Sequence, residues 1–113
     1  KMGIKLHVAE VYQVKHNSRD YFNNHSVDIN RMLYKYCPSL SWEGEDIECS
    51  ERLEVPRSEL ADLIGKIANN REDFEKWLKI HMIDITVDKF IRYIAEWIAF
   101  SDQRNDFVVL TWY

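Results

Sequence analysis

The residues best suited to chemistry are a histidine and two aspartates in the C-terminal half of the chain. His81 and Asp84 have the spacing His-x-x-Asp, and Asp88 lies about one helical turn further on. An imidazole beside carboxylates can transfer protons or hold a metal ion. However, His81 continues an apolar stripe, and a helix boundary at Thr86 separates the two carboxylates. We therefore predict a core or rim histidine, with no metal and no cofactor.

A second pair that could do chemistry is His16 with Asp20, in a polar segment. His25 directly precedes Ser26, and a histidine next to Ser18 or Ser26 could activate the hydroxyl as a nucleophile. The glycine-flanked turn that makes such a serine reactive is absent from the sequence. The three glycines are isolated and do not form a phosphate-binding loop. We predict no catalytic residue, and a small enzyme with a His/Asp site stays as an alternative hypothesis.

The most distinctive polar feature is the acidic segment 43–54, in which Arg52 is the one basic residue. Its side chains alternate with apolar ones in the pattern of a half-buried strand, so we expect this strand at or near a sheet edge with the acids facing water. Charged edges block strand-to-strand aggregation. An acidic edge could also imitate a nucleic acid in a basic groove, which makes an inhibitor of a nucleic-acid-binding enzyme an alternative function. The candidate interaction residues are Glu43, Glu45, Asp46, Glu48 and Glu54.

The helix expected after Thr86 has an unusually wide apolar face. Its inward side is formed by Val87, Phe90, Ile91, Ile94, Trp97 and Ile98. Tyr93 and Phe100 fall beside Trp97 and widen the apolar arc to about half the circumference. A helix on the outside of a small monomer rarely needs such a face, so we expect a homodimer with Tyr93, Trp97 and Phe100 in the interaction surface.

Composition indicates one globular domain over residues 1–113. Hydrophobic residues make up 46% of the chain, which is enough for a core, and the net charge of −4 argues against binding to nucleic acid or to anionic lipid. We expect Met2 to be the natural start and find no signal peptide, because Lys5, His7 and Glu10 interrupt the first apolar residues. No apolar run is long enough to cross a membrane. We expect a cytoplasmic protein with two free thiols, Cys37 and Cys49.

The periodicity predicts an α+β fold in the order β-α-β-α-α-α-β. Strands are expected at 4–16, 46–55 and 107–113, with about four helices packed mainly on one face of a small antiparallel or mixed sheet. We expect the first and last strands to pair, and the last strand to be an inner one because it is almost continuously apolar. The loop residues Tyr21 and Phe22 are expected to anchor their segment on the core.

Three polar residues are placed to begin helices. Ser26 is the expected N-cap of a helix that ends near Cys37, and Thr86 is the expected N-cap of the last helix. Asn70 is expected to open a helix with Asp73 as its capping-box partner. These assignments complete the predicted architecture.

The function class that fits these features best is a non-enzymatic, intracellular interaction or self-associating accessory protein with an unknown protein partner. Small acidic, aromatic-rich domains of this kind are common among accessory proteins of bacteria and their mobile elements, which is an analogy between classes of protein.

Overall fold

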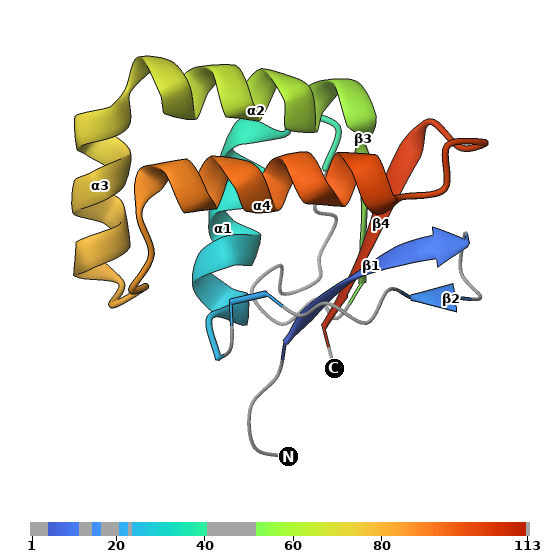
Figure 1. Cartoon of the computed structure of the whole chain (residues 1–113), viewed down its shortest axis with the longest axis horizontal. Helices are drawn as coiled ribbons and strands as arrows, with labels where there is room; N and C mark the ends of the chain where they lie inside the picture. The colour runs from blue at the N-terminus through green and yellow to red at the C-terminus, as the bar shows by residue number, and fades with distance from the viewer. Residues whose placement is uncertain (1–4, 12–14, 17–20, 23, 41–51, 113) are drawn as a thin grey trace.

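The computed structural model describes residues 5–11, 15–16, 21–22, 24–40 and 52–112, which form an α+β fold (Figure 1). In chain order the elements are β1 (Leu6–Val11), β2 (Lys15–His16), α1 (Ser26–Tyr36), β3 (Arg52–Pro56), α2 (Arg57–Asn69), α3 (Arg71–Ile80), α4 (Val87–Phe100) and β4 (Phe107–Trp112). The predicted order β-α-β-α-α-α-β is confirmed, with β2 as a short additional strand.

The strands form one antiparallel sheet in the order β2-β1-β4-β3. Leu6 of β1 pairs with Trp112 of β4, and Leu53 of β3 pairs with Leu110 of β4. The predictions that the first and last strands pair, that the last strand is an inner strand and that the strand ending near Val55 lies at an edge are all confirmed.

One face of the sheet carries the core. Alternate residues of β1, β3 and β4 join a single cluster of buried side chains to which α1, α2, α3 and α4 all contribute. Val109 points to the other face and is nevertheless buried, while Phe107 on that face is partly exposed. The inner position of β4 explains why its sequence is apolar on both faces.

The single strand predicted at 4–16 is two strands in the structure, because β1 and β2 both lie in this range and pair antiparallel with each other. Their pairing shifts register between Ala9 and Val11, as at a β-bulge. Residues 12–14 lie outside the described part. β3 likewise covers only Arg52–Pro56 of the predicted 46–55 strand, and the remainder lies outside the described part.

Thr86 caps α4 as predicted, but Ser26 does not cap α1. The Thr86 hydroxyl oxygen accepts a hydrogen bond from the Lys89 N–H at 3.1 Å. In α1 the N-cap is His25, whose N–H is already bonded to the Phe22 carbonyl at 3.0 Å. This turn starts the helix one residue earlier, so the Ser26 backbone is helical and its hydroxyl is not in the capping position.

The capping box predicted at Asn70 is also wrong. Asn70 is the N-cap of α3, but its side-chain amide donates to the Lys66 carbonyl at 2.8 Å. Asn70 is at the same time the C-cap of α2, because one residue separates the two helices. Its side chain therefore bonds a free carbonyl at the end of α2 instead of an N–H at the start of α3.

Candidate functional site

His81 is paired with a carboxylate that its local sequence does not contain. His81 is the C-cap of α3, and its Nδ1 lies 3.0 Å from Oδ1 of Asp28 in the first turn of α1. His81 is half-buried, in line with the predicted core or rim histidine. The candidate grouping with Asp84 and Asp88 does not form among the described residues, where Asp88 accepts a hydrogen bond from Arg71 at 2.8 Å and Asp84 is exposed. The sequence carried no signal for this pair, whose members are far apart along the chain.

A second imidazole approaches the same carboxylate. His25 Nδ1 lies 3.6 Å from Asp28 Oδ2, so Asp28 stands between His25 and His81. Asp28 lies at the N-terminal end of α1, and His81 lies at the C-terminal end of α3. Chemically, such a pair can orient an imidazole for proton transfer or fasten two helices together. Among the described residues, no three histidine, cysteine, aspartate or glutamate side chains lie close enough together to hold a metal ion.

The alternative pair His16 and Asp20 receives no geometric support. His16 is in β2 with its side chain outside the described part, and Asp20 is outside it altogether.

A cavity of about 430 Å³ opens beside His25. Its apolar lining comes from the segment before α1, the turn after α3 and α4, and consists of Tyr21, Phe22, Met82, Ile83, Ile85 and Tyr93. Lys5, His25 and Asp84 add charged or titratable groups. Its size is within the range of pockets that hold a small ligand or a protruding side chain.

The turn between α3 and α4 is a helix ending that the sequence did not reveal. The Met82 N–H donates to the Lys79 carbonyl at 3.1 Å, and the Ile83 N–H donates to the Leu78 carbonyl at 2.9 Å. These two bonds define a Schellman motif in which Met82 takes the left-handed position, with φ 57°, that glycine normally occupies. Buried Ile83 packs over the end of the helix, as this motif requires.

Met82 does not continue the apolar face of α3. The helix ends at Ile80, and the left-handed residue turns the Met82 side chain outward, leaving it 84% exposed. Ile80 is 75% exposed. We call Ile80, Met82 and the adjoining 430 Å³ cavity the turn surface.

The candidate interaction residues of α4 lie mostly inside the protein. Trp97 is fully buried, which excludes it from a surface in this structure. Tyr93 is half-buried, with its ring centre 5.0 Å from that of Tyr21 and 5.3 Å from that of Phe22. Phe100 is also half-buried. Tyr21 and Phe22 thus anchor their segment, as predicted, and cover much of the wide apolar face of α4.

Of the acidic candidates, only Glu54 is described. It is half-buried on the edge strand β3 and accepts a hydrogen bond from Arg52 at 2.9 Å. The candidates Glu43, Glu45, Asp46 and Glu48 lie outside the described part.

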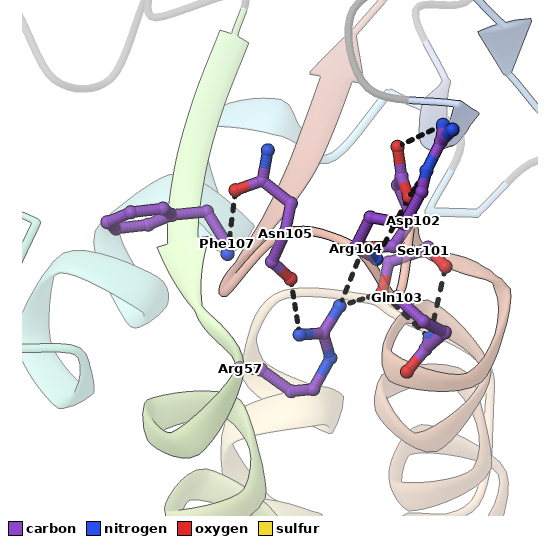
Figure 2. Close-up of polar contacts among 7 residues, drawn as sticks. All are labelled: Arg57, Ser101, Asp102, Gln103, Arg104, Asn105 and Phe107. Carbon is purple, nitrogen blue, oxygen red and sulfur yellow. Dashed lines mark hydrogen bonds and ion pairs between the residues drawn. The ribbon is translucent and has the colours of Figure 1, made fainter.

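A polar network that the sequence did not indicate joins the start of α2 to the loop after α4 (Figure 2). Arg57 donates to the Asn105 carbonyl, to the Ser101 hydroxyl at 2.8 Å and to the Asp102 carbonyl at 3.1 Å. Arg104 forms two bonds of 2.9 Å to the Asp102 carboxylate. These groups bind one another, so the network holds the loop and presents little for a ligand.

The predicted buried thiol is present at Cys37, which is free and fully buried. Burial raises its pKa to about 12, and the nearby Glu59 carboxylate acts in the same direction. A protonated thiol is a poor nucleophile and a poor metal ligand, so Cys37 belongs to the core. Cys49 lies outside the described part.

Each helix of the described part is too short or too polar to cross a membrane. No protein-family model, no curated protein and no solved structure matches this chain.

Proposed function

We propose that this chain is a non-enzymatic interaction protein that associates with a second copy of itself through the turn surface. The observation that carries the proposal is Met82, a large apolar side chain held out in water by a left-handed backbone. An L-residue in this conformation costs about 1–2 kcal/mol, whereas glycine avoids that cost. A feature that is costly for folding and exposes apolar area is typical of a functional surface.

A second copy is the partner whose shape fits this surface best. Met82 protrudes beside a cavity with an apolar lining, so the same patch offers both a projection and a recess. A twofold axis pairs each patch with itself and would set each Met82 against the cavity of the partner. Lys5 and Asp84 place both signs of charge at the cavity, so two copies can match opposite charges across the axis.

The proposed homodimer forms through the turn surface and not, as predicted from the sequence, through the apolar face of α4. The wide face of α4 is covered within the subunit by Tyr21 and Phe22, so the surplus of aromatic residues no longer requires a second copy. The exposed apolar residues of the turn after α3 are what favour a second copy as the partner. A cytoplasmic location fits the reduced Cys37 thiol.

The test compares oligomeric state and stability in two variants. Met82→Gly should raise the free energy of unfolding of the subunit by about 1 kcal/mol and yet abolish the dimer. Phe107→Ser is the matched control, because Phe107 is also partly exposed but begins β4, which follows the end of α4 remote from the turn after α3. Sedimentation velocity at micromolar concentration should show dimers for the wild type and for Phe107→Ser. A monomeric wild type, or a Met82→Gly variant that dimerises equally well, would refute self-association through this surface.

The acidic inhibitor is the second candidate function. It is supported by the edge position of β3, because an edge strand can present its side chains to a partner. Reversing Glu48 and Glu54 to Lys should leave the fold intact and abolish binding to a basic partner. Unchanged affinity at low salt would remove this candidate.

An enzyme is the third candidate, and the contact between Asp28 and His81 is the one observation in its favour. A catalytic activity that is lost in the His81→Gln variant but retained in the Met82→Gly variant would favour an enzyme over a non-enzymatic interaction protein.

A further inference from the structure

A second cavity, of about 370 Å³, lies between α1 and α3 and does not involve the turn surface. Its aromatic wall is formed by Tyr36, Phe74 and Trp77. Phe74 is buried, whereas Tyr36 and Trp77 are only half-buried and keep part of their ring surface open. The Trp77 ring already stacks on Phe90, with ring centres 6.0 Å apart, and lies 4.8 Å from the His81 ring, so its exposed part offers a flat ligand partial contact at the cavity.

Positive charge gathers at this cavity in a protein whose net charge is negative. Arg31 and Lys35 line it from one face of α1, one turn apart. The Lys35 ammonium lies 5.3 Å from the centre of the Tyr36 ring, and the Lys66 ammonium lies 5.5 Å from the same ring. Both are within the range of cation–π attraction. Only Lys35 lines this cavity, whereas Lys66 lines a separate pocket with Glu59 and Asp62.

One carboxylate, Asp73, also belongs to the lining. It lies in the first turn of α3, where the positive end of the helix dipole offsets part of its charge. The two lining cations, Arg31 and Lys35, outnumber it. The balance of charge therefore favours an anion.

We propose that this cavity binds a planar aromatic ligand carrying an anionic group, with the ring against Tyr36 and Trp77 and the anion at Arg31 and Lys35. The volume is at the small end of ligand pockets, which suits a single ring system with one charged group. Aryl sulfonates, aryl carboxylates and nucleoside monophosphates share this chemistry. The ring supplies apolar contact, and the anion supplies orientation through guanidinium and ammonium groups.

The experiment uses isothermal titration of the full chain with naphthalene-2-sulfonate and with AMP. At least one should bind with a dissociation constant below about 1 mM, and the preference between the two distinguishes an aryl anion from a nucleotide. Naphthalene, adenosine and inorganic phosphate are the comparison probes, each lacking either the charge or the ring. Each should bind at least about tenfold more weakly than its charged aromatic counterpart.

Two matched variants locate the binding. Lys35→Met keeps most of the apolar stem and removes the charge, and it should weaken binding about tenfold or more. Lys76→Met is the control, because Lys76 is exposed on α3 and does not line the cavity. NMR spectra should show the Trp77 indole N–H shifting with the same dissociation constant, and thermal melts verify that both variants fold.

No binding by either charged probe at 5 mM, roughly the weakest affinity of interest, would overturn the proposal. It is also overturned if adenosine and naphthalene bind as well as the anions, or if Lys35→Met and Lys76→Met behave alike.

Discussion

Asp28 Oδ1 lies 3.0 Å from His81 Nδ1, and this contact joins the first turn of α1 to the end of α3. Both side chains are partly buried, with 25% of Asp28 and 31% of His81 exposed. The contact therefore holds the start of α1 against the end of α3, next to the turn surface.

Replacing Asp28 by Asn should lower the free energy of unfolding by about 1 kcal/mol, because the contact with His81 and the interaction of the carboxylate with the α1 dipole are both weakened. Urea denaturation measures the change. Asp62→Asn is the control, since Asp62 is exposed on α2, and it should change stability by less than about 0.5 kcal/mol. Equal losses in the two variants would contradict a specific role for the contact.

Stability should fall at alkaline pH because of Cys37. Burial raises the pKa of this thiol to about 12 from 9.0 for a free thiol, so above pH 9 the unfolded chain releases a proton that the folded chain retains. The contribution is complete below pH 9 and is lost as pH rises toward 12, at up to about 1.4 kcal/mol per pH unit. Denaturation midpoints between pH 8 and about 11 measure it. The wild type should lose more stability over this range than Cys37→Ala, and parallel curves would disprove the assignment.

Gly65→Ala should stabilise the protein by about 1 kcal/mol, because alanine is the better helix former. Gly65 is exposed within α2, and no described atom lies within 4 Å of the position a Cβ would take, so close helix approach does not explain the glycine. Thermal unfolding of the variant gives the sign. Ala68→Gly, an exposed position of the same helix, should produce a loss of similar size, and a destabilised Gly65→Ala would show an unrecognised contact.

Arg57→Met should lower the free energy of unfolding by about 2 kcal/mol, because three acceptors in the loop after α4 lose a charged donor. The exposed Arg52, which bonds only its neighbour Glu54 among the contacts described, provides the matched comparison. Arg52→Met should cost less than about 0.5 kcal/mol. If hydrogen exchange of residues 101–106 is unaltered in Arg57→Met, the network does not hold the loop.

Patterns that repeat along the chain were sufficient to predict most of the architecture. The alternation of Leu53 and Val55 with Glu54, and the helical spacing of Phe90, Ile94 and Trp97, report which face each element buries. The Thr86 cap is also local, since its hydroxyl bonds an N–H three residues away. Such features depend on backbone periods of two and 3.6 residues, which neighbouring residues alone can express.

Features that depend on contacts between distant segments were decided by the tertiary structure. His81 had a suitable carboxylate nearby in the sequence, yet the fold supplies Asp28 from another helix. Tyr21 and Phe22 cover the aromatic side of α4, which no period within α4 can reveal. Packing also overrode local preference at Met82, where burial of Ile83 over the end of α3 places methionine in the conformation that glycine favours. The sequence by itself determined the elements and their buried faces, whereas the surface available for binding emerged only when those faces were packed together.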